Sequence, residues 1–163
     1  GRELREDLEI NIYKNRKQQQ QQHEAVLRAD AEYVKDVMNA LVKSRFDRRG
    51  GPRKALEIFA TLIRLYNEGE SWIVPNRFHY TIAISAFGKL GTPEAASNAQ
   101  QILKSMWRRF EDAVSSSKHH NGDDNEDAYM MAPDTITYCA LMDVWSKSSH
   151  PDAGKKAEGV LRD

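Results

Sequence analysis

The feature that most constrains the fold of this chain is an internal repeat. The stretch PNRFHYTIAISAFGKLGTPEAASNAQQILKSM begins at Pro75 and matches PDTITYCALMDVWSKSSHPDAGKKAEGVLRD, which begins 58 residues later at Pro133, without a gap. The matched positions are Pro75 and Pro133, Asn76 and Asp134, Tyr80 and Tyr138, Lys89 and Lys147, Pro93 and Pro151, Ala99 and Ala157, and Ile102-Leu103 and Val160-Leu161. A match at one fixed offset predicts a supersecondary unit that the chain uses more than once.

Each copy of the repeat carries two apolar faces with helical spacing. The spacing i, i+3, i+4, i+7 occurs at Tyr80, Ala83, Ile84 and Phe87, and again at Ala99, Ile102, Leu103 and Met106. The later copy has Tyr138, Leu141, Met142 and Trp145, then Ala157, Val160 and Leu161; a fainter upstream copy has Val34, Val37, Met38 and Leu41, then Ala55, Ile58, Phe59 and Leu62. Faces that recur in pairs predict two short amphipathic helices per copy, joined as an α-hairpin.

One segment carries a competing signal. Thr135-Ile136-Thr137-Tyr138 has the β-branched and aromatic content of a strand, although Tyr138 also opens a helical face. A period that is sustained in three copies outweighs the β-propensity of four residues. We therefore expect a helix here, with Asp134 as its N-cap, and an all-α chain.

The turns inside the hairpins carry signals for the start of a helix. In Gly91-Thr92-Pro93-Glu94, Thr92 is the expected N-cap and Pro93 the first helical residue. His150-Pro151-Asp152 and Gly51-Pro52 repeat this device, so a helix is expected to start at each of these prolines as well. Proline suits the first turn because it fixes φ and lacks only an N–H that this turn leaves unpaired.

These patterns divide the chain into five segments. Hairpin copies are expected at 31–66, 75–110 and 131–163, the last one shortened because the pattern stops before the position that would match Met106, as in a fragment of a longer array. Residues 1–30 hold Leu4, Leu8 and Ile12 at helical spacing and a glutamine-rich run at 17–23, which suits either a helix or a linker. Residues 111–130 are rich in serine, asparagine and acids, and we expect an acidic, mobile insert.

Composition narrows the class of protein. Lysine plus arginine and aspartate plus glutamate number 24 each, so the net charge of +0 gives no global support to a nucleic-acid partner. Cys139 is the only cysteine, which excludes an internal disulfide and a cysteine-based zinc site and favours a reducing compartment. No apolar run approaches the roughly 20 residues that a membrane-spanning helix needs, so no membrane partner is expected.

The sequence offers no recognisable catalytic site. It contains no P-loop, no Gly-x-Ser-x-Gly and no zinc-deaminase pattern, so we expect neither enzymatic activity nor a cofactor. His119, His120 and the acids that follow them lack the spacing of a zinc or calcium site, and no metal is expected.

The recurring pattern resembles that of pentatricopeptide repeats. The resemblance rests on proline followed by Asp or Asn, then Tyr, an apolar face that ends in Lys, and a second face that begins with Ala; it is good over 75–110 and 131–163 and weaker over 31–66. The family consists of helical hairpins of about 35 residues that stack into a right-handed superhelix. The resemblance therefore implies an α-solenoid of stacked antiparallel helical hairpins that binds single-stranded RNA in a mitochondrion or plastid.

The match departs from the family in two respects. The turn between the paired helices is longer than in the family pattern, in both of the better copies. The segment 111–130 also separates two hairpins that would normally adjoin each other. Because both copies share the longer turn, we interpret it as a trait of a subfamily. The inserted segment, in contrast, makes the packing of one hairpin against the next uncertain.

The resemblance assigns roles to residues of the first helix in each hairpin. It implies that the residue after Tyr and the Asp or Asn of the next copy read one base together, which pairs Thr81 with Asp134 in the manner of a guanine reader. The corresponding base-reading positions hold Lys35 and Asn76 in the earlier copy and Cys139 in the later one. These residues fit none of the residue pairs that commonly read a base in the family. Phe78 and Ile136 are placed to sandwich bases, and Lys89 and Lys147 to reach phosphates.

Each of these residues also has a structural interpretation. Asp134 and Asn76 are good N-caps, and Phe78 and Ile136 could pack against the neighbouring hairpin. Lys89 and Lys147 complement the helix dipole. Tyr80, Tyr138, Phe87 and Trp145 are expected in the core. The rival function is a scaffold or structural subunit of an organellar ribosome or complex, which would use the same surface for protein.

Overall fold

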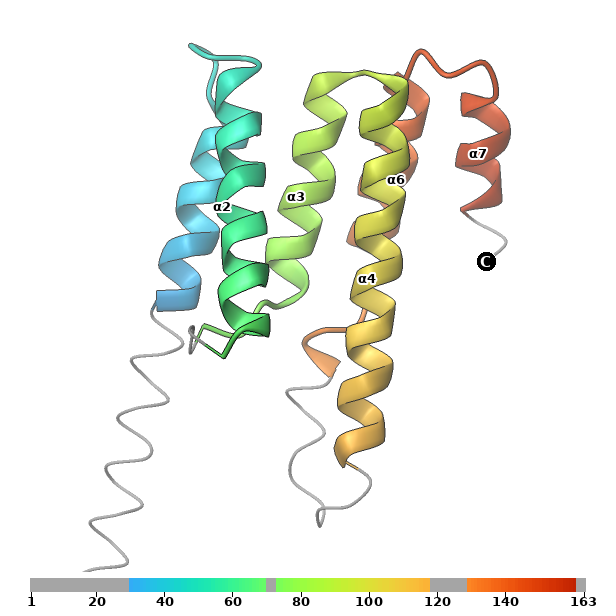
Figure 1. The fold of residues 1–163 in the computed structure, drawn as a ribbon. Coiled ribbons are helices and arrows are strands. Elements are labelled where there is room, and N and C mark those ends of the chain that lie inside the picture. The colour runs from blue at the N-terminus through green and yellow to red at the C-terminus, as the bar shows by residue number, and fades with distance from the viewer. Residues whose placement is uncertain (1–29, 70–72, 118–128, 161–163) are drawn as a thin grey trace, which may run out of the picture.

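The computed structural model describes residues 30–69, 73–117 and 129–160, and the regular elements in these ranges are all helices (Figure 1). They are a helix at 30–43, α2 (Gly50–Asn67), α3 (Arg77–Leu90), α4 (Pro93–Ser117), α6 (Thr135–Lys147) and α7 (Ala153–Gly159). The prediction of an all-α chain is confirmed for this part of the chain. Residues Thr135–Tyr138, whose composition is typical of a strand, form the start of helix α6, as the helical period predicted.

The helices lie side by side with their axes roughly aligned (Figure 1). Helix α3 occupies the centre, since it packs against α2, α4 and α6, and α6 packs in turn against α4 and α7. Helices α3 and α6 run in the same direction, because Thr81 meets Thr137 near their starts and Ser149 donates a hydrogen bond to the Gly91 carbonyl, at 3.3 Å, just after their ends. At the ends of the two helices the equivalent positions Gly91 and Ser149 are thereby neighbours, whereas Thr81 and Thr137 are two positions short of exact equivalence.

Two apolar clusters hold these helices together. One joins Met38 and Val42 of the first helix to Ala55 and Phe59 of α2, Tyr80, Ala83 and Ala86 of α3, and Met106 of α4. Within it, the rings of Phe59 and Tyr80 meet edge to face with their centroids 5.0 Å apart. The other joins Ile84, Ala96, Ala99 and Leu103 to Leu141, Val144, Trp145 and Val160. The apolar faces read from the sequence thus point inward.

Side-chain caps start the central helices as the sequence predicts. Asp134 accepts a hydrogen bond from the backbone N–H of Thr137 at 2.9 Å, and Thr92 accepts one from the N–H of Ala95 at 3.1 Å. Both predicted N-caps are therefore confirmed. Helix α4 begins at Pro93, and Gly91 terminates α3 with a φ of 66°, a left-handed conformation that glycine adopts without strain.

The other two prolines do not start helices as expected. Helix α2 begins at Gly50, two residues before Pro52, because the Asp47 carboxylate accepts the Gly50 N–H at 2.6 Å and so caps the chain earlier. Pro52 is tolerated there because the N–H groups of the first turn have no intrahelical partner. Helix α7 begins only at Ala153, after a turn in which the Ala153 N–H bonds to the His150 carbonyl.

The segment expected as an insert is partly helical. Helix α4 continues to Ser117, so 111–117 belong to it rather than to a loop. Neither glycine nor proline interrupts the chain before Gly122, and Phe110 anchors this end of the helix between the rings of Trp107 and Tyr129, at centroid distances of 5.6 and 6.2 Å. The rest of the insert, at 118–128, and nearly all of the segment 1–30 lie outside the described residues.

No helix in the described ranges has the length and apolar character needed to cross a membrane.

Leu141 is fully buried, and its removal tests the packing of α6. Replacing it with alanine should lower the free energy of unfolding by about 2–5 kcal/mol, because the cavity that remains cannot be refilled completely. The matched control is Ile136→Ala on the same helix, where the side chain is 66% exposed and the expected change is within about 0.5 kcal/mol. Urea denaturation followed by circular dichroism measures both; equal effects would contradict the assigned face.

Candidate nucleic-acid interface

The candidate interface is a row of exposed and partly exposed side chains on the first helices of the three helical pairs. We call Lys35, Phe78, Ile136 and Cys139 the first-helix row. Phe78 and Ile136 are 42% and 66% exposed and lie at equivalent positions of α3 and α6, and Cys139 is exposed one turn further along α6. These side chains are not packed into the core, so the expectation that Phe78 and Ile136 are available to a ligand is compatible with their exposure.

Lys35 lies against this row from the first helix. Its Nζ is 5.6 Å from the centroid of the Phe78 ring and forms ion pairs with Glu32 and, at 3.7 Å, with Asp36. The hydrogen bond that Lys35 donates to the Glu32 carboxylate raises the pKa of Lys35 above its ordinary value. Lys35 is thus a permanent cation over an aromatic face, and its described contacts do not join it to Asn76, its expected partner.

Asn76 works as a helix cap. Its side-chain oxygen accepts the N–H of Phe78 at 3.1 Å, and its backbone N–H donates to Nδ1 of His79 at 3.2 Å, which completes a capping box. His79 is fully buried, and its Nε2 lies 3.1 Å from the Ala31 carbonyl of the preceding helix. His79 therefore ties the start of α3 to the first helix.

Thr81 and Asp134, the pair expected to read one base, are joined through Thr137. The Thr137 hydroxyl donates to Oδ1 of Asp134 at 2.8 Å, and the oxygens of Thr81 and Thr137 are also 2.8 Å apart. Because a hydroxyl has one proton, Thr137 must accept the proton of Thr81. Thr81 is left with acceptor lone pairs only, and the Asp134 carboxylate on the other side of the Thr137 hydroxyl is likewise an acceptor.

The Asp134 carboxylate keeps its charge. Burial alone would raise its pKa, but the hydrogen bonds from the N–H and hydroxyl of Thr137, together with the Arg77 guanidinium 3.7 Å away, outweigh burial and lower it. Arg77 is itself held by the carbonyl of Tyr129 at 3.1 Å. The site is therefore an anion supported by one fixed cation.

Three residues of this arrangement were missed by reading the sequence: Thr137, His79 and Arg77. Thr137 and His79 occupy the third helical position after an Asp or Asn cap, which is where a capping box places its second member. That spacing could have identified both as cap partners. Arg77 directly follows the cap, and no local pattern predicts that it would reach residues 129 and 134.

The lysines proposed to contact phosphate end their helices as expected. Lys89 lies exposed in the last turn of α3 and Lys147 in the last turn of α6, where both complement the helix dipole. Lys147 also forms an ion pair with Asp143 at 2.6 Å.

The aromatic residues expected in the core divide into two groups. Tyr80 and Trp145 are almost fully buried, at 1% and 2% exposed. Phe87 and Tyr138 are half-buried, and the Tyr138 hydroxyl accepts a hydrogen bond from Nε1 of Trp107 at 2.9 Å. Tyr138 thus bridges α6 and α4 at the surface as well as packing against the core.

Groups that could hold a metal are lacking in the described ranges, where no three His, Cys, Asp or Glu side chains come together. His119, His120 and the neighbouring acids lie outside those ranges.

No protein-family model, no curated protein and no solved structure matches this chain. Its function must therefore be argued from its own residues.

The burial of His79 predicts a pH dependence of stability. Burial lowers the pKa of His79 below its ordinary 6.5, so the unfolded chain binds the proton more readily than the folded one. Its contribution to stability is therefore complete above pH 6.5 and is lost as the pH falls from 6.5 towards the lowered folded pKa. Chemical denaturation between about pH 7.5 and about pH 5.5 should show a smaller loss for His79→Thr, which copies Thr137, than for the wild type. Identical pH profiles would contradict this assignment.

The hydroxyl of Thr137 provides a second test. Thr137→Val keeps the shape of the side chain but leaves Thr81 and Asp134 without their shared partner, so unfolding should become easier by about 1–3 kcal/mol. Thr137→Ser, which keeps the hydroxyl, should recover most of that loss in a thermal or urea melt. Thr135→Val on the exposed side of the same turn serves as control and should change stability by less than about 0.5 kcal/mol.

Proposed function

We propose that this chain is part of a pentatricopeptide-type repeat array that binds single-stranded RNA in a mitochondrion or plastid. In this proposal the helical pairs continue as stacked hairpins of an α-solenoid, and the first helices line the surface that faces the RNA. Support comes from the repeated sequence pattern and from the parallel packing of α3 and α6, which brings the equivalent positions Gly91 and Ser149 together.

The observation that carries the proposal is the exposed aromatic ring at the start of α3. Phe78 is 42% exposed at the position where the family stacks a base, and the Lys35 ammonium lies over its ring. An apolar side chain of this size is normally buried, and α3 offers a packed core on its other face. A ring held at the surface beside a cation suits the face of a nucleobase.

The chemistry beside Phe78 suits a base with hydrogen-bond donors. Thr81 presents lone pairs, and Asp134 has an oxygen besides the one that accepts both bonds from Thr137. Two neighbouring acceptors match the N1–H and N2–H₂ donors of guanine, in agreement with the base that the resemblance implies. Ile136 and Cys139 would contact the next base, and Lys89 and Lys147 the phosphates.

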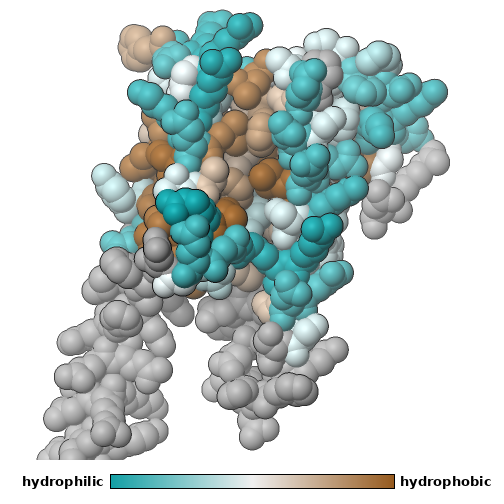
Figure 2. All heavy atoms as spheres, viewed as in Figure 1, coloured by the Kyte–Doolittle hydropathy of each residue, from teal (hydrophilic) through white to brown (hydrophobic). Residues whose placement is uncertain are grey.

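A protein scaffold is the second candidate function, and two observations favour it. The chain carries no net charge, whereas nucleic-acid-binding surfaces are usually basic. Apolar side chains also gather over α2 and between α2 and α4 on one face of the molecule (Figure 2). Such a face would suit a protein subunit of an organellar complex.

Binding to RNA at several salt concentrations separates the two functions. For the repeat array that contains this chain, affinity for single-stranded RNA should fall as salt rises, because displaced counterions accompany each phosphate contact. Phe78→Ala should weaken binding to all bases alike by about 1–3 kcal/mol, because a stacking surface is lost.

Phe46→Ala is the matched control. Phe46 is a fully exposed phenylalanine in the turn before α2, away from the first-helix row, so its removal should leave RNA affinity unchanged. Absence of RNA binding even at low salt would support the scaffold instead. Equal losses of RNA affinity in Phe78→Ala and Phe46→Ala would show that any exposed phenylalanine contributes to binding, and that the first-helix row has no special role.

A further inference from the structure

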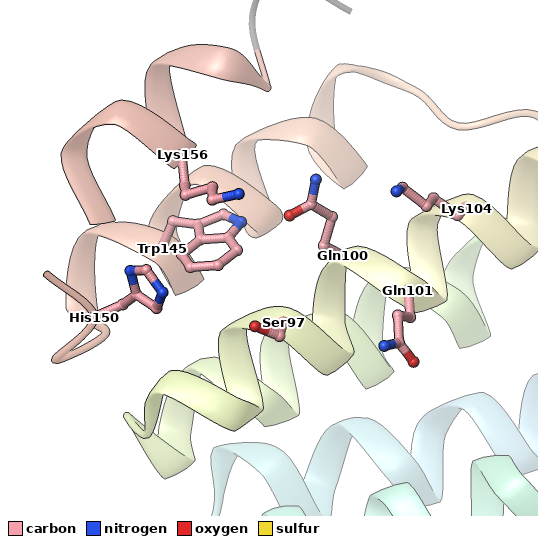
Figure 3. A pocket seen from close by; sticks show the side chains of 7 residues that line it. All are labelled: Ser97, Gln100, Gln101, Lys104, Trp145, His150 and Lys156. Carbon is pink, nitrogen blue, oxygen red and sulfur yellow. The ribbon is translucent and has the colours of Figure 1, made fainter. Parts of the chain in front are cut away.

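A polar pocket lies between α4, α6 and α7, where the proposed function has no use for it. The cavity of about 260 Å³ is lined by Ser97, Gln100, Gln101, Lys104, Trp145, His150 and Lys156. Figure 3 shows these side chains, which come from three helices and the turn before α7, arranged around a common space. None of them belongs to the first-helix row.

A buried hydrogen-bond donor faces this pocket without an acceptor. Trp145 is only 2% exposed, and its indole Nε1 is buried with no hydrogen-bond partner. Figure 3 places this nitrogen on the side of the ring where Lys156 and Gln100 lie. Buried donors almost always find an acceptor, so an acceptor that occupies the pocket would complete the site.

The charge of the pocket identifies what kind of acceptor fits. Its lining contains the ammonium groups of Lys104 and Lys156 and no carboxylate, and neither lysine takes part in an ion pair among the residues that the structure describes. The Nδ1 of His150 accepts the Asp152 N–H at 3.0 Å, which places the proton of a neutral imidazole on Nε2 as a further donor. The lining is therefore rich in donors and positively charged.

We propose that this pocket binds a phosphate group. Two ammonium groups and several neutral donors match the charge and the many acceptor oxygens of phosphate better than the two oxygens of one carboxylate. A water molecule would also satisfy Trp145, but it would gain nothing from the charges of Lys104 and Lys156, whose side chains are exposed. The volume is just below the range of about 300–1,000 Å³ for sites of larger ligands, which suits a phosphate with little attached to it.

Two sources supply this chemistry: free phosphate or a small phosphorylated molecule, and the phosphate of a nucleic-acid backbone. The pocket does not depend on the base-reading residues proposed above, so it can exist whether or not Phe78 and Thr81 contact RNA. The failure of either proposal would therefore leave the other intact.

The test follows the indole N–H of Trp145 by nitrogen-15 NMR of the whole chain, with inorganic phosphate as the probe at constant ionic strength. Loss of one indole signal in Trp145→Phe identifies the resonance among the three tryptophans. Phosphate should shift this signal in a saturable manner. Lys156→Met should weaken the binding about tenfold, because a charge-assisted hydrogen bond is lost.

Lys155→Met is the matched control, since the neighbouring lysine pairs with Asp152 at 3.9 Å and does not line the pocket. It should bind phosphate like the wild type. No shift of the Trp145 signal, or equal responses of wild type and Lys156→Met, would overturn the proposal. If Trp145→Phe fails to fold, sequential assignment of the wild-type spectrum identifies the signal.

A second arm of the experiment separates the two sources. A short single-stranded RNA that shifts the same signal, in competition with inorganic phosphate, assigns the pocket to the nucleic-acid backbone. A saturable response to phosphate with none to RNA assigns it to a small phosphorylated ligand. Both outcomes support a phosphate site, whereas insensitivity of this signal to inorganic phosphate refutes it.

Discussion

The close approach of α3 and α6 is the contact on which the rest of the structure depends. A Cβ added to Gly88 would meet Cγ2 of Val144 at 3.1 Å, which is tighter than ordinary van der Waals contact, so any larger residue at position 88 would require Val144 to shift. The same approach lets the hydroxyls of Thr81 and Thr137 bond at 2.8 Å. Because α3 also packs against α2 and α4, this contact aligns the second and third helical pairs and sets the spacing of the first-helix row.

The sequence predicted the helices, their buried faces and their caps more reliably than the contacts between hairpins. A helical period is a local property, and N-caps such as Thr92 and Asp134 need only a few residues to be recognised. The starts of α2 and α7 were wrong because proline permits a helix start without fixing it, and Asp47 caps α2 earlier. The bond between Thr81 and Thr137 spans 56 residues, and no spacing rule relates those positions.

The functional and structural interpretations of Asp134 are compatible with each other. Its Oδ1 accepts both bonds from Thr137, which is enough to cap α6, while the one partner of Oδ2 among the described residues is Arg77 at 3.7 Å. An ionised carboxylate offers about four acceptor sites, so capping does not exhaust it. Asn76 differs, because its single side-chain oxygen accepts the Phe78 N–H and also lies 2.9 Å from Nδ1 of His79. The N-cap position therefore offers a second carboxylate oxygen at Asp134 and an amide group at Asn76.

The ion pairs of the surface lysines affect how strongly this chain, which has no net charge, could attract the phosphates of RNA. On the first helices, Lys35 already pairs with Glu32 and Asp36, and Lys147 with Asp143. An RNA phosphate that bound either lysine would have to displace the acid with which that lysine is paired. Each such contact would therefore add less net attraction than a contact with an unpaired lysine, which only releases a salt cation from the RNA. Lys89 forms no ion pair among the described residues, so affinity on this surface would depend mainly on Lys89, on the exposed ring of Phe78 and on the acceptors of Thr81 and Asp134. Lys104 and Lys156 also form no ion pair among the described residues, and both line the pocket at Trp145, where a single phosphate group could contact the two of them.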